Sequence, residues 1–236
     1  MQIQNKIKAD IIKTDSGEIK LSPDIIRQYL VNGNGKVTDQ EVMMFLGLCK
    51  GQRLNPFIKE AYLIKYGDSS PATVVVSKDV FMKRAVKNPD FNGIESGVIV
   101  LSQDGDVIKK PGALYVKGVE QLIGAWAKVY RKSWAHPLEV EVNYDEYVGL
   151  VNGKPNRQWS SKPATMIVKV AKSQALREAF IEDLQGMYDD SEMNVDVGDI
   201  QTQPIQEQQV VMEQPKAMQQ EYKESIPEVV DGNDIF

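Results

Sequence analysis

Four cationic side chains occur in the segment WSSKPATMIVKVAKSQALREAF (residues 159–180), and no acidic residue accompanies them before Glu178. At about 100° per residue in a helix, these cations share one broad face with Thr165 and Ser173, opposite small apolar residues. Ammonium, guanidinium and hydroxyl groups are the donors that phosphate oxygens accept. The solvated face of an amphipathic helix would look similar, but such faces normally mix both charge signs. The pattern therefore favours contact with phosphate. The cations are Lys162, Lys169, Lys172 and Arg177.

Two other segments place cations beside aromatic rings, namely KDVFMKRAVK (residues 78–87) and VYRKSWAHP (residues 129–137). This combination suits single-stranded nucleic acids, because cations follow the backbone while rings can stack on bases. We therefore expect a basic groove for a single strand. The cations of the two segments that we assign to this groove are Lys83, Arg84, Arg131 and Lys132.

Catalytic motifs are missing from the sequence. His136 is the only histidine and Cys49 the only cysteine, so the chain cannot assemble a zinc site from Cys and His. No phosphate-binding loop of the G-x-x-x-x-G-K-[ST] type occurs. A metal site made only of carboxylates stays open. The sequence predicts a binding protein without a catalytic site.

Charge divides the chain into two unlike parts. Residues 1–188 carry 26 Lys and Arg against 21 Asp and Glu, whereas residues 189–236 carry 2 against 12. A basic body with an acidic tail suggests a polyanionic partner for the body. No apolar run of about 18 residues indicates a membrane span, and the N-terminus lacks the features of a secretory signal. With a single cysteine, these features favour the cytoplasm.

The pattern of elements predicts an α+β fold with a small, mostly antiparallel sheet, a long C-terminal core helix and a disordered acidic tail. We expect an N-terminal arm over residues 1–36 with one short helix, a core over 37–190, and a glutamine-rich tail over 191–236 that cannot bury enough surface to fold. A capping box at Thr38 and Glu41 begins a core helix. Expected strands are 59–66, 72–77, a hairpin within 97–108, 124–132 and 137–144, and further helices are 78–88, 145–154 and 159–180.

Three motifs then resemble the phage single-strand annealing proteins of the Bet/RecT family, over about residues 37–192. Leu54-Asn55-Pro56-Phe57, Lys59-Glu60 and Tyr62 are similar to the first family signature. Tyr130-Arg131-Lys132 followed by His136-Pro137 is similar to the second. Trp159, Pro163, Met166, Gln174, Arg177, Ala179, Phe180, Gly186 and Tyr188 match the family's C-terminal core helix in order and spacing.

The resemblance implies a phage or prophage protein that binds single-stranded DNA in a deep basic groove and anneals complementary strands without ATP, in rings or helical filaments. It implies no cofactor, although divalent cations can affect annealing non-specifically. It also implies an exonuclease partner and contact with the host single-strand DNA-binding protein or its partners. Lys59 and Gln174 join the DNA-binding candidates by their match to family positions. This sequence has small or apolar residues at Ala164, Thr165 and Val168, where relatives can be basic.

The chain ends in an acidic, phenylalanine-terminated tip that is similar to the tip of bacterial single-strand DNA-binding proteins. Such a tip could dock in a basic pocket of a partner, and a solubilising tail with an accidental ending is an equal alternative. Its candidate partner-binding residues are Asp231, Asp234, Ile235 and Phe236.

Three rival functions remain at this point. The nearest is a passive protein that protects single-stranded DNA without annealing it. The others are a metal-dependent nuclease and a scaffold without a nucleic-acid role. An annealing protein accelerates duplex formation between complementary oligonucleotides, whereas a passive protector slows it.

Overall fold

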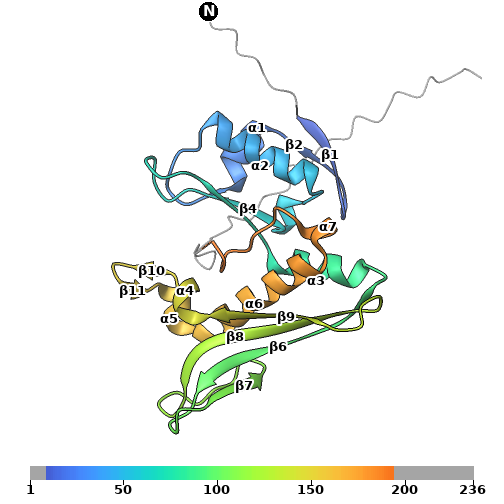
Figure 1. Ribbon diagram of the computed structural model, residues 1–236. Coiled ribbons are helices and arrows are strands. Elements are labelled where there is room, and N and C mark those ends of the chain that lie inside the picture. Colours follow the sequence, from blue (N-terminus) through green and yellow to red (C-terminus); the bar gives the residue numbers. More distant parts are fainter. Residues whose placement is uncertain (1–8, 194–236) are drawn as a thin grey trace, which may run out of the picture. The chain divides into compact units, whose positions relative to one another are not determined.

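The computed structural model describes residues 9–193 of the chain (Figure 1). The expected disordered tail and its tip lie outside the described residues. Helices and mostly antiparallel strands are both present, which confirms the α+β class. The strands are β1 (Asp10–Thr14), β2 (Gly17–Leu21), β3 (Val31–Asn32), β4 (Ala61–Ile64), β5 (Thr73–Val76), β6 (Phe91–Leu101), β7 (Val107–Pro111), β8 (Gln121–Arg131), β9 (Leu138–Asn143), β10 (Leu150–Val151) and β11 (Lys154–Pro155). The helical elements are α1 (Pro23–Ile25), η1 (Ile26–Leu30), α2 (Asp39–Gly51), η2 (Pro56–Ile58), α3 (Lys78–Lys87), α4 (Tyr144–Tyr147), α5 (Arg157–Ser161), α6 (Pro163–Ala179) and α7 (Ile181–Leu184).

The larger sheet has four strands in the order β7-β6-β8-β9, each antiparallel to its neighbour. The turn between β6 and β7 contains Gly105 with a φ of 88°, so the hairpin predicted at Asp104-Gly105 is confirmed. Close packing also fixes Gly97 in β6, because a Cβ there would lie 1.8 Å from the carbonyl oxygen of Lys110. The close approach of β6 and β7 therefore requires a residue without a side chain at position 97.

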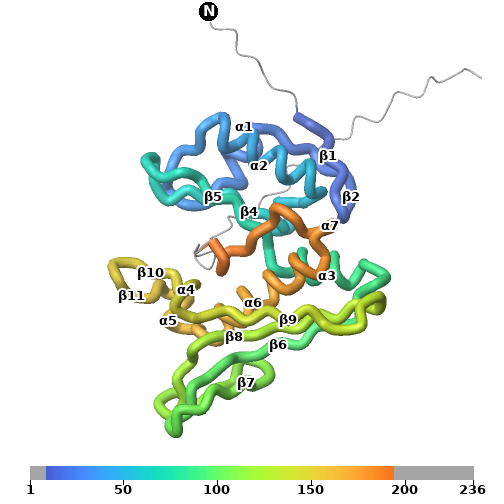
Figure 2. The backbone as a smooth tube through the Cα atoms, viewed as in Figure 1, coloured from blue at the N-terminus to red at the C-terminus, as the bar shows by residue number. Residues whose placement is uncertain are grey.

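Helix α6 packs on one face of this sheet, against β6, β8 and β9 (Figures 1 and 2). Ten of its 17 residues are buried, among them Ile167 and Leu176. The single helix expected over residues 159–180 is divided, because Lys162 has a φ of −136° and Pro163 begins the longer helix. Proline fixes φ and lacks an amide hydrogen, so it suits a first helical position. Trp159 lies on α5 instead, with 1% of its surface exposed.

Before α3 in the chain, helix α2 and the three-stranded sheet β3-β4-β5 contribute further side chains to the hydrophobic core. The predicted capping box is confirmed, because Thr38 Oγ1 accepts from the amide of Glu41 at 3.2 Å and Glu41 Oε2 accepts from the amide of Thr38 at 2.7 Å. Glu41 also accepts from Lys65 Nζ at 2.8 Å and from the amide of Ala72 at 2.8 Å. These donors, led by Lys65, lower the pKa of Glu41 to about 2.

Two segments differ from expectation. The region of the expected N-terminal arm contains the hairpin β1-β2 in addition to a short helix. The helix expected over 145–154 is wrong beyond Tyr147, because a second hairpin, β10-β11, follows. Its central residues Asn152 and Gly153 have φ values of 52° and 74°. Positive φ at both central positions is typical of a tight hairpin turn, and Asn-Gly is its preferred sequence.

Candidate nucleic-acid interface

One side of α6, together with Lys162 just before the helix, carries polar donors that reach solvent. Lys162 and Thr165 are exposed and Lys172 is half-buried. Within residues 9–193, neither of these two lysines forms an ion pair with a carboxylate. We call Lys162, Thr165 and Lys172 the open row. Its three side chains are available to an anionic ligand.

The two cations that the sequence placed beside the open row, Lys169 and Arg177, are paired. Lys169 forms an ion pair with Asp190, and only 15% and 6% of these two side chains are exposed. Arg177 donates from Nη1 and Nη2 to the two carboxylate oxygens of Glu192, at 2.8 and 2.7 Å. The acids that α6 lacks are therefore supplied by the acidic segment Asp189–Glu192, which follows α7 in the chain.

Arg177 has two further contacts in the same part of the chain. Its guanidinium lies 4.6 Å from the ring centroid of Tyr188, and its Nη1 donates to the carbonyl oxygen of Met187 at 3.2 Å. Although burial opposes it, the hydrogen bond to Glu192 raises the pKa of Arg177. Arg177 therefore stays charged and held to residues 187–192.

A hydroxyl network completes the contact between α6 and the acidic segment. Ser173 is 2% exposed, and its Oγ donates to Asp189 Oδ2 at 2.5 Å. Asp189 Oδ1 accepts from the amides of Ser191 and Glu192 at 2.8 and 3.1 Å. On another side of the helix, Gln174 Nε2 donates to Tyr147 Oη at 2.6 Å. Gln174 thus joins α6 to α4, apart from the acidic segment.

Arg131, at the end of β8, is enclosed by three elements. Its Nε donates to Asp90 Oδ2 at 2.6 Å and its Nη1 to the carbonyl oxygen of Ala179 at 2.6 Å. The guanidinium lies between two rings, 5.0 Å from the centroid of Trp134 and 4.9 Å from that of Phe180. This arrangement fastens the strand to the end of α6. The role of Arg131 in DNA contact remains a prediction.

Asp90 organises the loop that follows Arg131. Its two carboxylate oxygens accept from the Oγ and the amide of Ser133, at 2.6 and 2.7 Å. The Ser133 hydroxyl and Arg131 together lower the pKa of Asp90 to about 2. Lys132 donates from Nζ to the carbonyl oxygen of Pro89 at 2.7 Å while its side chain remains exposed. The motif Tyr130-Arg131-Lys132 therefore has a structural role at this turn.

The first family motif has a similar internal network. Glu60 is 7% exposed and accepts from Lys83 Nζ at 2.7 Å and from the amide of Asn55 at 2.9 Å. Lys59 has a left-handed backbone with a φ of 64°, and its side chain is exposed. Within residues 9–193, the side chain of Lys59 has no hydrogen bond or ion pair. Of the cations in and near this motif, Lys59 and Arg53 are exposed, and within the described residues their side chains form no hydrogen bond or ion pair.

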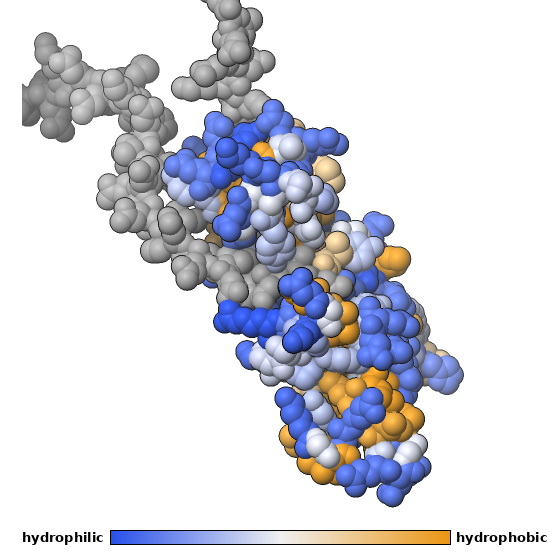
Figure 3. All heavy atoms as spheres, turned by 90° about the vertical axis from the view of Figure 1, so that its left-hand side faces the viewer, coloured by the Kyte–Doolittle hydropathy of each residue, from blue (hydrophilic) through white to orange (hydrophobic). Residues whose placement is uncertain are grey.

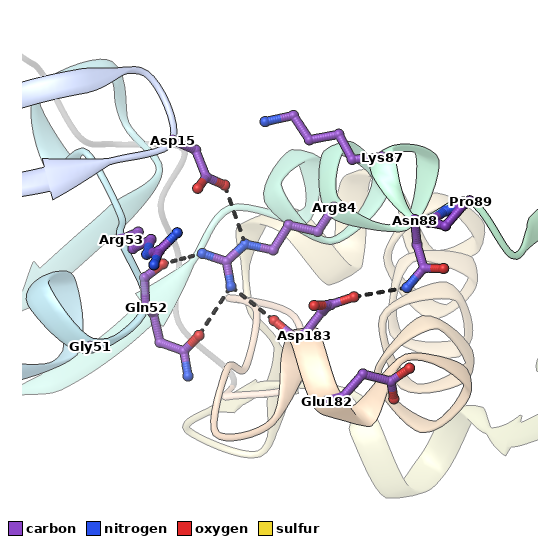
Figure 4. Close-up of a pocket in the computed structure, with 10 residues that line it drawn as sticks. All are labelled: Asp15, Gly51, Gln52, Arg53, Arg84, Lys87, Asn88, Pro89, Glu182 and Asp183. Carbon is purple, nitrogen blue, oxygen red and sulfur yellow. Dashed lines mark hydrogen bonds and ion pairs between the residues drawn. The ribbon is translucent and has the colours of Figure 1, made fainter.

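Arg84 points into a cleft of about 500 Å³ between the β1-β2 turn, the end of α2, α3 and α7 (Figure 4). Its guanidinium donates to Gln52 Oε1 at 3.0 Å and to the carbonyl oxygen of Asp183 at 2.8 Å, and it also donates to the carbonyl oxygen of Gln52. Asp15 Oδ2 lies 3.7 Å from Arg84 Nε. The cleft has cations and acids on its walls, and Arg84 connects these walls.

The sequence did not predict that the acidic segment contacts α6. Periodicity compares residues within one helix, whereas Asp190 lies 21 positions after Lys169. A signal was present in Gly186, which has a φ of 73° and allows the chain to turn after α7. Ser173, which lies on the cationic face, is buried and donates a hydrogen bond to Asp189, so it is not an exposed donor.

Across residues 9–193, no group of three or more His, Cys, Asp and Glu side chains is placed to hold a metal ion. In the same range, no helix combines the length and hydrophobicity needed to cross a membrane.

Comparison with known proteins identifies the family. No curated protein matches this chain. The family model described as the RecT family matches residues 17–212 and so covers every helix and strand from β2 to α7, all of α6 included. Members of this family interact with single-stranded DNA, form oligomers and anneal strands in DNA recombination, and they are not enzymes in the usual sense. Since the match extends over most of the sequence, the chain belongs to the RecT family.

Proposed function

We propose that this protein binds the phosphates of single-stranded DNA along α6 and anneals complementary strands in homologous recombination without ATP. The observation that carries the proposal is the open row, in which Lys162, Thr165 and Lys172 have no carboxylate partner within residues 9–193. Lysine and hydroxyl donors on one helix suit the oxygens of a sugar–phosphate backbone. Family membership supports the same function.

Contacts to the DNA backbone alone are sufficient for annealing. Phosphate contacts are indifferent to sequence, and they leave base edges free to test pairing with a second strand. No proton transfer, nucleophile or nucleotide cofactor is required for this. We also propose that the protein acts in the cytoplasm of a bacterial host and that a phage exonuclease is its partner.

The predicted DNA contacts fall into two groups. Lys59, Lys162 and Lys172 have side chains without carboxylate partners in the described range, and we rank them first. The others have internal partners, so they contact DNA only if those contacts open or are shared. This second group contains Lys83, Arg84, Arg131, Lys132, Lys169, Gln174 and Arg177.

The proposed assembly is a ring or filament of identical subunits whose grooves adjoin. Exposed apolar side chains concentrate in residues 107–119, where Leu114 is 78% and Val107 65% exposed. Figure 3 shows hydrophobic side chains at the lower end of the molecule, where Figure 1 places β7. Patches of this kind are typical of protein contacts. This surface and residues 1–36 are our candidates for the subunit interface.

A strand-annealing assay with two complementary labelled oligonucleotides tests the proposal, with Lys172→Gln beside Lys154→Gln. Both substitutions remove one exposed or half-buried lysine charge, but Lys154 lies on β11 rather than on α6. We expect acceleration of annealing by the parent protein and by Lys154→Gln. Lys172→Gln should weaken strand binding and reduce the slope of log affinity against log salt by about 0.7, the value for one phosphate contact.

Two results would reject parts of the proposal. Slower duplex formation in the presence of the parent protein would indicate a passive protector of single strands. Equal salt slopes for Lys172→Gln and Lys154→Gln would remove the open row from the interface.

A further inference from the structure

The acidic segment Asp189–Glu192 is held against α6 by a defined path of the chain. After α7, Gly186 adopts a φ of 73° and residue 187 is fully buried. The carbonyl oxygen of Tyr188 then accepts from the amide of Val76 at 2.8 Å, at the end of β5. These contacts bring the acidic segment beside the helix face that carries Lys169, Ser173 and Arg177.

Three successive positions of one helical face then meet three acids. Lys169 pairs with Asp190, Ser173 with Asp189 and Arg177 with Glu192. The positions 169, 173 and 177 are four residues apart, so their donors recur about every 6 Å along the helix axis. The three carboxylates thus form a row of anions beside a row of donors.

These carboxylate oxygens stand where phosphate oxygens would bind. Both kinds of oxygen accept charge-assisted hydrogen bonds from lysine and arginine, and arginine binds both in a two-point fork. Glu192 occupies both Nη atoms of Arg177 in this way. The open row lies beside these donors on the same helix, with Lys172 between Lys169 and Ser173 in sequence, so α6 carries both vacant and occupied donors.

The contact between the acidic segment and α6 leaves one buried carboxylate oxygen without a hydrogen-bond partner among the described residues. Asp190 is 4% exposed, and its Oδ2 is buried without a hydrogen-bond partner among the described residues. Burial raises the pKa of Asp190 even though Lys169 opposes this shift. A buried, unpaired carboxylate oxygen costs free energy, which lowers the cost of replacing the segment by another anion.

We propose that Asp189–Glu192 is an internal competitor of the DNA backbone, which covers Lys169, Ser173 and Arg177 in the free protein and is displaced by a bound strand. The inference rests on the proposed function, because the strand must first engage the open row. From Lys162 to Arg177 the helix extends over about 22 Å. A short oligonucleotide can therefore occupy the open row without reaching Arg177, whereas a longer one also exchanges with Glu192.

Hydrogen exchange on the full-length parent protein, with and without an excess of oligothymidylate of about 30 nucleotides, tests the displacement directly. The amides of Ser191 and Glu192 donate to Asp189 Oδ1 in the free protein. We expect their exchange to accelerate when DNA binds, while the amide of Glu41 in the capping box keeps its rate. Unchanged or slower exchange at Ser191 and Glu192 in the DNA complex would overturn the inference.

A matched pair of variants, Glu192→Gln and Glu178→Gln, provides the second measurement. Each raises the net charge by one, but the exposed Glu178 has no ion pair within residues 9–193, whereas Glu192 holds Arg177. We expect Glu192→Gln to bind oligothymidylate at least about fivefold more tightly than Glu178→Gln, the lower end of typical couplings between sites. Equal affinities of the two folded variants would contradict competition.

The failures of the two proposals are distinguishable. Absence of salt-dependent binding to oligothymidylate by the parent protein would remove the proposed function itself. Binding that depends on Lys172, together with a protected acidic segment, would remove only the competitor and leave Asp189–Glu192 as a permanent part of the fold. Because the exchange experiment uses the parent protein, it stands even if Glu192→Gln unfolds.

Discussion

Arg131 donates from Nη1 to the carbonyl oxygen of Ala179 at 2.6 Å, which joins the end of β8 to the last residue of α6. A cation at a helix C-terminus also interacts favourably with the helix dipole. The second family motif therefore contributes to the attachment of α6 to its sheet.

We expect Arg131→Lys to destabilise the fold by roughly 1–3 kcal/mol, because a lysine cannot replace the several hydrogen bonds of a planar guanidinium. Urea denaturation measures the change. Lys87→Arg is the control, since Lys87 is exposed and has no hydrogen bond or ion pair within the described range, and it should leave the free energy of unfolding nearly unchanged. Equal stability of the parent and Arg131→Lys would show that the enclosed guanidinium is dispensable.

The lowered pKa of Glu41 predicts a loss of stability in acid. The carboxyl has a pKa of about 2 in the folded protein against 4.5 in an unfolded chain. Its contribution is fully present above pH 4.5 and decreases as the pH falls toward 2, because the unfolded state binds the proton more tightly. Thermal melts from pH 6 to pH 2 measure this loss.

The variant Glu41→Gln should show a shallower dependence on pH over the same window. It should also be less stable at neutral pH, because the buried Lys65 loses its partner. Glu18→Gln, on the exposed hairpin β1-β2, should retain the parent's dependence. A parent-like slope in Glu41→Gln would place the acid-sensitive group elsewhere.

Two glycine substitutions should have opposite effects. Gly97→Ala places a Cβ against the carbonyl oxygen of Lys110 and near Trp126 Nε1, so β6 and β7 must separate or the fold is lost. Gly47→Ala, on the exposed side of α2, meets no atom within 4 Å. There we expect stabilisation of about 0.4–1 kcal/mol, because alanine reduces the entropy of the unfolded chain. Thermal unfolding of both variants compares them, and a tolerated Gly97→Ala would contradict the close approach.

The length of the DNA strand should affect binding in two stages. Oligothymidylates too short to extend from Lys162 to Arg177 should lose affinity in Lys172→Gln and hardly respond to Glu192→Gln. Longer strands should respond to both substitutions. Titrations over a series of lengths measure the two responses. An effect of Glu192→Gln that is the same at every length would contradict sequential engagement of the helix.

Local signals in the sequence predicted local structure well. The capping box at Thr38, the turn at Gly105 and the amphipathic character of α6 each depend on residues within a few positions of one another. The Asn152-Gly153 turn has an equally clear signal. The strands on either side have only two residues each and are too short to show a period, so the pattern predicts a helix there instead of a hairpin.

The candidate site was less predictable because its charges are decided by contacts between distant segments. A helical wheel places Lys169 and Arg177 on one face with Lys172, but it cannot show which of them meets an acid. That distinction comes from a turn at Gly186, which brings Asp190 and Glu192 back to the helix. The cations were therefore found from the sequence, and their partners were not.

The deep burial of α6 has a consequence for how a strand can be held. Since the opposite side of the helix is packed into the sheet, the backbone positions that carry its donors cannot shift relative to one another without opening the core. Lys162, Thr165, Lys169 and Lys172 therefore follow one another at intervals of about 4.5–6 Å along a rigid axis. Under the function proposed above, a bound strand adapts its backbone to this spacing, so strands of any sequence take up one conformation.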